Sequence, residues 1–314
     1  MRAADIERYV RDYVRVSSWN RVKFDRLTAV LSHMHDKGID CILLKGADLI
    51  PRLYGVLGLR PLGDVDMLVH ECALPSLDLV LRQLGYRPEI DGNPAYRDPD
   101  GILALDIVTS LWYAHDQRWI WRRAVSRDVA GVPIKGLGTN DLLIYVTAYN
   151  VVHRGWVTTS FARDVAVLVQ KEAVDWDFVV DQACRSHLRI PIYHGLSFVV
   201  RRWAGVGIPD HVLRRLAPST VSQRLCSLAL EQLVTDEPVG GVGHLLLFLT
   251  QPGWKKWRWL RDAFFPSAAF LGYRYGDRSE AHAFRIRLAR PLHLLSETVR
   301  LVLRLTRRRI TARV

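Results

Sequence analysis

An apolar run that ends in a lysine and a glycine, followed by two aspartates on one strand, most constrains how this chain folds. The run Cys41-Ile-Leu-Leu44 has the composition of a buried strand, and Lys45-Gly46 directly after it favours a turn into a helix. Further along, Asp64 and Asp66 stand two positions apart in a second strand-like stretch. Because successive side chains of a strand alternate between its faces, both carboxylates are expected on the same face of a sheet.

A third aspartate, Asp106, stands alone in the apolar stretch 102–108. An unpaired charge is costly to bury, and neighbouring carboxylates repel one another unless a cation neutralises them. Magnesium binds through oxygen ligands, commonly one or two carboxylates together with substrate phosphates. We therefore interpret Asp64, Asp66 and Asp106 as ligands of divalent ions. The alternative, solvated turn residues, would suffice for an isolated Asp-x-Asp pair.

Helices and strands alternate around these residues before strands cluster. Hydrophobic spacing predicts helices over 3–37, 47–54 and 74–84, and strands over 39–44, 65–70, 86–90, 95–97 and 102–108. This order is typical of an α+β fold in which a small mixed sheet has flanking helices.

From residue 140 onward the pattern is almost wholly helical. Gly131, Pro133, Gly136 and Gly138 cluster between the two regions, and such residues punctuate chains at boundaries. We expect two domains, a catalytic domain over 1–130 that includes the N-terminal helices, and an all-helical domain over 131–314.

The motifs resemble those of the DNA polymerase beta-like nucleotidyltransferase superfamily. They are most similar to a poorly characterised bacterial nucleotidyltransferase family with the pattern Leu-Leu-Lys-Gly-Ala, a tyrosine, then Arg-Pro-x-x-Asp-x-Asp-Leu-Leu-Val. This chain reads Leu43-Leu-Lys-Gly-Ala47, Tyr54 and Arg60-Pro-Leu-Gly-Asp-Val-Asp-Met-Leu-Val69. Segments around His153 and Asp164 also resemble the helical part of that family. Their roles are left open, because packed or hydrogen-bonded residues would fit equally well.

The resemblance implies roles for individual residues. Asp64 and Asp66 would bind two Mg²⁺ ions, or Mn²⁺ in their place, and Asp106 would be the third carboxylate that helps to activate the nucleophile. Lys45, Gly46 and Ala47 would contact the triphosphate, and Arg60 would offset its charge. Where the superfamily usually has Gly-Gly or Gly-Ser at the turn, this chain has Gly-Ala, so one phosphate-binding hydroxyl is missing.

The implied reaction moves a nucleoside monophosphate from a triphosphate such as ATP to a hydroxyl or phosphate acceptor, with release of pyrophosphate. A protein, a peptide or a small molecule is the favoured acceptor, and RNA stays open. The rival interpretation is a non-catalytic binding protein that keeps the fold and acts on RNA or a protein partner through its basic helical domain. A metal-dependent phosphohydrolase would use the same acids, but the His-Asp clusters usual in such sites are absent from the sequence.

Charge and cysteine content indicate what kind of partner and which cellular compartment suit this chain. The net charge of +12 favours polyanionic partners, and much of the excess lies after Trp254, including an expected amphipathic helix over 291–309. That helix could bind a membrane surface or nucleic acid, or simply pack. The four cysteines are widely spaced, which argues against a zinc ribbon or a disulfide framework and favours the cytoplasm. No apolar run reaches the length of a membrane span. The oligomeric state is left open.

Overall fold

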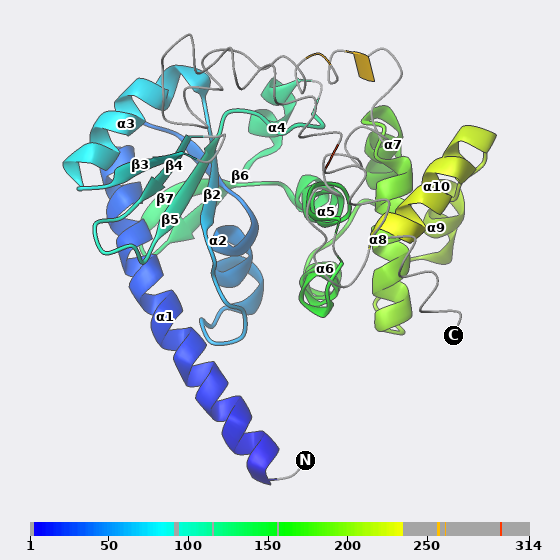
Figure 1. Ribbon diagram of the computed structural model, residues 1–314, viewed down its shortest axis with the longest axis horizontal. Helices are drawn as coiled ribbons and strands as arrows, with labels where there is room; N and C mark the ends of the chain where they lie inside the picture. The colour runs from blue at the N-terminus through cyan, green and yellow to red at the C-terminus, as the bar shows by residue number, and fades with distance from the viewer. Residues whose placement is uncertain are drawn as a thin grey trace. The chain divides into compact units, whose positions relative to one another are not determined.

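The structure is a computed structural model that describes residues 3–90, 94–114, 116–155, 157–234, 256–257, 261 and 296. The chain divides into two compact units, Met1–Gly138 and Thr139–Val314 (Figure 1). The described elements of the first unit are α1 (Ala3–Asp36), β1 (Cys41–Leu43), α2 (Lys45–Leu49), the π-helix η1 (Ile50–Tyr54), β2 (Val65–Val69), the 3₁₀ turn η2 (Glu71–Ala73), α3 (Leu74–Gln83), β3 (Arg87–Ile90), β4 (Pro94–Arg97), β5 (Ala104–Val108), α4 (Gln117–Arg123), β6 (Val125–Val129) and β7 (Val132–Gly136).

The strands form one mixed, seven-stranded sheet in the order β3-β4-β5-β2-β1-β7-β6. At its centre β2 pairs antiparallel with β1 and parallel with β5. The parallel register places Asp66 opposite Asp106, and Val65 opposite Leu105. A mixed sheet with flanking helices confirms the predicted α+β fold.

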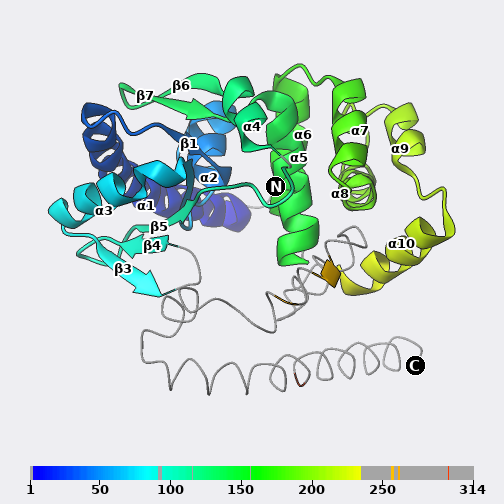
Figure 2. The same cartoon turned by 90° about the horizontal axis from the view of Figure 1, so that it is seen from above.

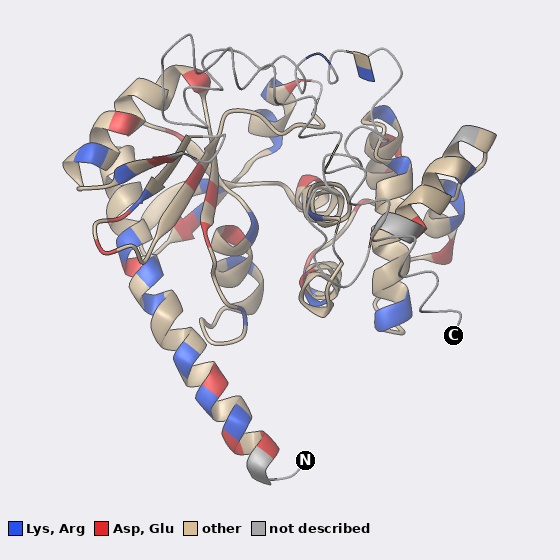
Figure 3. Cartoon of the chain, in the orientation of Figure 1, with Lys and Arg blue, Asp and Glu red and all other residues tan. Residues whose placement is uncertain are grey.

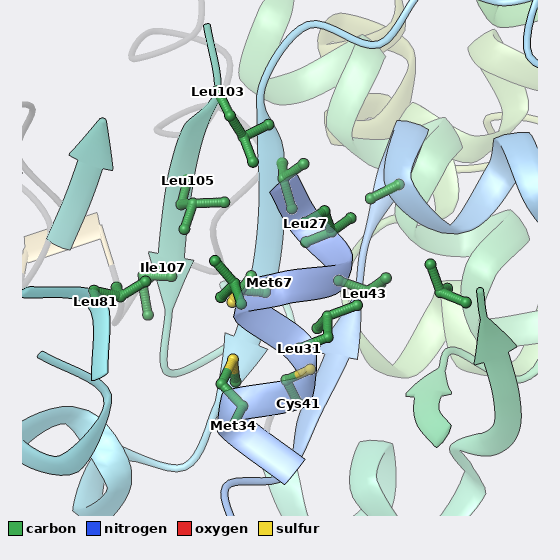
Figure 4. Close-up of a cluster of buried hydrophobic side chains, with 14 of the residues drawn as sticks. Leu27, Leu31, Met34, Cys41, Leu43, Met67, Leu81, Leu103, Leu105 and Ile107 are labelled. Carbon is green, nitrogen blue, oxygen red and sulfur yellow. The ribbon is translucent and has the colours of Figure 1, made fainter. Parts of the chain in front are cut away.

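One face of the central strands belongs to a large apolar core. Alternate residues of β2 and β5, among them Met67 and Ile107, pack with Leu27, Leu31 and Met34 of α1 (Figure 4). These three side chains recur at the spacing of one helix face, which is why α1 lies against the sheet there. Since Asp66 and Asp106 alternate with the core residues of their strands, they project from the opposite face.

The hairpin of β6 and β7 was missed from the sequence, where its glycines and proline indicated a linker. Gly131, in the left-handed conformation with φ of 85°, forms the turn, and Asp128 Oδ1 accepts a hydrogen bond from its backbone N–H at 2.8 Å. β7 then pairs parallel with β1 and extends the sheet (Figure 2). The hairpin belongs to the compact unit Met1–Gly138, and the division into domains over 1–130 and 131–314 stays a prediction.

The described elements of the second unit are helical. They are α5 (Thr139–Ala148), the π-helix η3 (Tyr149–Arg154), α6 (Thr159–Lys171), α7 (Trp176–Arg185), α8 (Arg189–Arg202), α9 (Asp210–Leu216) and α10 (Val221–Leu233). Residues 141–148 of α5 are all buried, so this helix forms the centre of the unit. Gly195 of α8 packs so closely on it that an added Cβ would lie 2.3 Å from Thr147 Cγ2.

The expected C-terminal helix over 291–309 lies outside the described residues except for Ser296. Among the helices that the structure describes, none combines the length and the apolar character needed to cross a bilayer.

Candidate active site

Three carboxylates converge on the face of the sheet opposite the apolar core. Asp64 directly precedes β2, Asp66 lies within it, and Asp106 lies on β5 in register with Asp66. One carboxylate oxygen from each aspartate lies within 4.8 Å of the other two. Figure 3 shows Asp and Glu positions of the sheet as red segments. The tertiary structure thus brings together the two acids that strand alternation placed on one face and Asp106, the isolated charge of the apolar stretch 102–108.

Lys45 contributes a positive charge to this cluster. It is the first residue of α2, and its Nζ forms a largely buried ion pair with Asp66 Oδ1. Its backbone has φ of 48°, a left-handed conformation that is uncommon for a residue other than glycine, asparagine or aspartate. Strained backbone of this kind clusters at functional sites. Lys45, for which the family resemblance implies a contact with the triphosphate, therefore lies beside the carboxylates and is paired with one of them.

Gly46, the next residue, lies against Arg60. A Cβ added at Gly46 would be 2.6 Å from Arg60 Nη1 and 2.9 Å from Leu62 Cδ1. The absence of a side chain at Gly46 therefore lets the guanidinium lie directly over the turn. Ala47 is fully buried in the hydrophobic core, so its side chain packs and only its backbone is suited to bind a phosphate.

Two residues of α1 that the sequence analysis did not single out hold the loop before Asp64. Asn20 donates hydrogen bonds to the carbonyls of Leu57 and Arg60 and accepts one from the backbone N–H of Leu62. Lys23 Nζ donates to two further carbonyls of the same loop. A signal was present in the sequence: Asn20 precedes Phe24, Leu27 and Leu31 at helical spacing, so it belongs to the core-facing stripe of α1.

The environment of Lys23 is polar and partly buried. Burial lowers the pKa of its ammonium group, and the negative charge of Asp64 opposes that shift. Lys23 and Lys45 each interact electrostatically with one member of the aspartate cluster. Both side chains therefore offset part of the repulsion among the three carboxylates.

The cluster has the donor set that magnesium or manganese requires. Both ions prefer carboxylate oxygens, and three such groups within 4.8 Å can share a metal centre. Soft or nitrogen ligands are not needed to complete it, because substrate phosphates and water commonly fill the remaining positions. The residues present therefore fit a hard divalent ion.

The second unit contains the two further residues noted in the sequence. His153 is exposed at the end of the π-helix η3 and stacks on Tyr149, with ring centroids 5.3 Å apart. Asp164 is buried in α6. Neither environment assigns a chemical role.

A mixed sheet that gathers three aspartates beside a strand-to-helix turn has the parts expected of a nucleotidyltransferase. Residues 4–204 match the sequence profile of a family described as uncharacterised nucleotidyltransferase, and the chain belongs to this family. The match confirms the class of transferase that the motifs at 43–47 and 60–69 predicted. No curated protein matches the chain in sequence.

Solved structures show weaker likeness. The solution structure of the antibiotic-resistance factor ANT(2'')-Ia is 15% identical, with a TM-score of 0.42, and the match covers 59% of this chain and 100% of that one. A crystal structure of ANT(2")-Ia in complex with adenylyl-2"-tobramycin is 13% identical, with a TM-score of 0.41, and covers 54% and 98%. An antigenic nucleotidyltransferase-like protein from Paracoccidioides brasiliensis is 14% identical, with a TM-score of 0.44, and covers 62% and 93%.

Proposed function

We propose that this protein is a metal-dependent nucleotidyltransferase that moves a nucleoside monophosphate from a nucleoside triphosphate to a hydroxyl or phosphate acceptor. The observation that carries the proposal is the convergence of Asp64, Asp66 and Asp106 within 4.8 Å. Membership of a nucleotidyltransferase family supports the type of reaction.

Asp64 and Asp66 would hold two Mg²⁺ ions, and Asp106 would complete the site on the side of the acceptor. When bound, such ions stabilise charge on the attacking and leaving oxygens of an in-line displacement. Lys45, the Gly46 backbone N–H and Arg60 lie at the turn next to the carboxylates and would bind the triphosphate. On this account Lys45 exchanges Asp66 for a phosphate oxygen when the substrate binds.

In the proposed reaction the acceptor oxygen forms a bond to the α-phosphorus of the triphosphate. The bond from that phosphorus to the oxygen bridging the β-phosphate breaks, and its electrons leave with pyrophosphate. When the acceptor is a hydroxyl, its proton passes to the carboxylate of Asp106. The residues around the cluster thus position both reactants and neutralise the charge that develops between them.

A protein, a peptide or a small molecule is our proposed acceptor, selected by the helical unit. The free cysteines, of which Cys72 and Cys184 are exposed, suit a reducing cytoplasm. The proposed acceptor class and the proposed cytoplasmic location are inferred from the sequence. The proposed chemistry is inferred from the aspartate cluster.

The decisive experiment replaces two of the carboxylates. We expect Asp64→Asn combined with Asp66→Asn to lower nucleotidyl transfer by ~100-fold or more, since metal-assisted charge stabilisation is worth several kcal/mol. The protein is incubated with each labelled triphosphate and Mg²⁺, and pyrophosphate, orthophosphate and labelled products are measured. Asp40→Asn, which affects an exposed ion pair with Lys135, is the matched control and should retain activity.

Three results would contradict the proposal. If the double variant transferred nucleotide as fast as the wild-type protein, Asp64 and Asp66 would not be ligands of a catalytic metal. Orthophosphate in place of pyrophosphate would indicate a hydrolase. No turnover by the wild-type protein with any triphosphate, combined with tight RNA or protein binding, would favour a non-catalytic binding protein.

A further inference from the structure

The loop before Asp64, residues 57–63, is hydrogen-bonded to α1 through the buried side chain of Asn20. Asn20 is 1% exposed, and its Nδ2 donates to Leu57 O at 2.6 Å and to Arg60 O at 2.7 Å. Its Oδ1 accepts a hydrogen bond from Leu62 N at 2.9 Å. The amide thus spans both ends of a tight segment, and aspartate or leucine of similar size could not make all three bonds.

Lys23, one turn further along α1, extends this attachment. Its Nζ donates to Leu62 O and Gly63 O, both at 2.7 Å, immediately before the first aspartate of the cluster. An ammonium that donates to two successive carbonyl oxygens fixes the direction of the backbone that leads into β2.

The segment held in this way carries two groups of the candidate active site. Arg60 lies over Gly46 at the strand-to-helix turn, and Asp64 supplies one oxygen of the carboxylate cluster. Neither group belongs to a regular element, because β2 begins only at Val65. Their positions therefore depend on the contacts of the loop, among which are the hydrogen bonds from Asn20 and Lys23 of α1.

We propose that Asn20 and Lys23 are positioning residues, which hold the 57–63 loop so that Asp64 and Arg60 are placed for a divalent ion and for the triphosphate. This inference rests on the proposed function. Partners of metal ligands commonly contribute 10- to 100-fold to metal affinity, because they fix the ligand's orientation.

The test measures Mn²⁺ binding to the full chain by electron paramagnetic resonance, without nucleotide, together with thermal unfolding. We expect Asn20→Ala and Lys23→Met each to weaken Mn²⁺ binding by roughly 10-fold. Lys23→Arg, which keeps a donor to the carbonyls, should restore most of the affinity. The control is Arg26→Met on the same helix, which breaks tertiary ion pairs with Asp98 and Asp100 and leaves the loop untouched.

Lys23→Met also separates positioning from simple charge. Removal of a positive charge near Asp64 would strengthen cation binding if electrostatics alone decided the result. Weaker binding therefore supports positioning, and stronger or unchanged binding overturns it for Lys23. This variant keeps every hydrogen bond of Asn20, so it stays informative if Asn20→Ala fails to fold.

Failure of this inference differs from failure of the proposed function. If the wild-type protein binds Mn²⁺ and Asn20→Ala binds it equally well while unfolding at a lower temperature, as Arg26→Met should, Asn20 only stabilises the fold. If the wild-type protein binds no Mn²⁺, or binds it unchanged after Asp64→Asn with Asp66→Asn, the metal site itself is wrong.

Discussion

At the scale of residues, Lys45 and Gly46 differ in backbone conformation: the lysine, and not the glycine, has the left-handed conformation. The left-handed backbone conformation falls on Lys45, whereas at Gly46 the side-chain ends of Arg60 and Leu62 occupy the space that a Cβ would take. A left-handed conformation costs a lysine roughly 1–2 kcal/mol. Its ion pair with Asp66 is one contact that opposes this cost. The turn therefore carries the Lys45 ammonium and packs against the Arg60 guanidinium.

The close packing at Gly46 gives a prediction. In Gly46→Ala the new methyl group must displace the Arg60 guanidinium, and we expect the KM for the triphosphate to rise by roughly 10-fold, because a charge-assisted hydrogen bond is worth about 1.5–3 kcal/mol. Stability should change little, since the atoms that move are the ends of flexible side chains. Steady-state kinetics and thermal unfolding measure the two effects.

Gly63→Ala is the matched control for Gly46→Ala. No atom lies within 4 Å of a Cβ added at Gly63, so this variant should keep the KM of the wild-type protein. Equal KM values for the two variants would show that Arg60 does not bind the nucleotide from its place over the turn.

At the scale of elements, α1 has two different halves. Leu27, Leu31 and Met34 in its second half pack on the sheet, whereas Ile6 and Val14 in its first half are exposed. Both sets have helical spacing, so the periodicity predicted the helix without showing which stripe would be buried. Asn20 marks the transition between the halves, at the point where the helix reaches the loop before β2.

The contact between α8 and α10 gives a prediction about pH. His194 Nε2 lies 2.9 Å from Ser227 Oγ, and burial lowers the pKa of His194. Glu231 acts to raise it and Arg201 to lower it. The folded-state pKa is below the unfolded value of 6.5, so the unfolded chain binds more protons between the two values. Because folding favours the neutral form of His194, its contribution to the free energy of unfolding is complete above pH 6.5. That contribution is lost as the pH falls from 6.5 through the folded-state pKa.

We therefore expect the free energy of unfolding to decline as the pH falls below about 6.5, and His194→Gln to flatten that decline. Denaturant unfolding at a series of pH values measures the slope. His211→Gln, at an exposed position of α9, is the control and should keep the wild-type slope. An unchanged slope in His194→Gln would assign the pH dependence to other groups.

At the scale of the whole molecule, the sheet belongs entirely to the unit Met1–Gly138. Two contacts hold the C-terminal end of this unit: β7 pairs with β1, and Arg52 donates a hydrogen bond to Leu137 O at 2.7 Å. Arg52 also forms a fully buried ion pair with Asp48. The last residues of the unit are thus tied to the helical segment that follows the Lys45-Gly46 turn.

These contacts predict how two fragments behave. A fragment of residues 1–138 keeps all seven strands and should unfold cooperatively. A fragment of residues 1–130 loses β7, exposes an edge of β1 and removes a partner from the buried Arg52. Its midpoint should fall by on the order of 10 °C or more, because the fragment loses the pairing and burial of β7, and the Arg52 guanidinium loses a hydrogen-bond acceptor worth about 1.5–3 kcal/mol. Circular dichroism melts compare them, and equal midpoints would contradict this account of the hairpin.

Local patterns in the sequence were enough to predict α1, the strands that carry the aspartates and the α+β class. Periodicity is a property of neighbouring residues, so it can be read without knowing what an element packs against. The same alternation placed Asp64 and Asp66 on one face, and an isolated charge in an apolar stretch marked Asp106. The roles of these residues in catalysis remain predictions.

Folding in three dimensions settled the relations between distant parts of the chain. The register that sets Asp66 opposite Asp106, the pairing of Lys45 with Asp66 and the attachment of the 57–63 loop to Asn20 all join residues far apart in sequence. The β6–β7 hairpin was hidden because glycine and proline favour a turn whether it joins two domains or two strands. Such choices depend on the surface available to pack against, which local spacing does not contain.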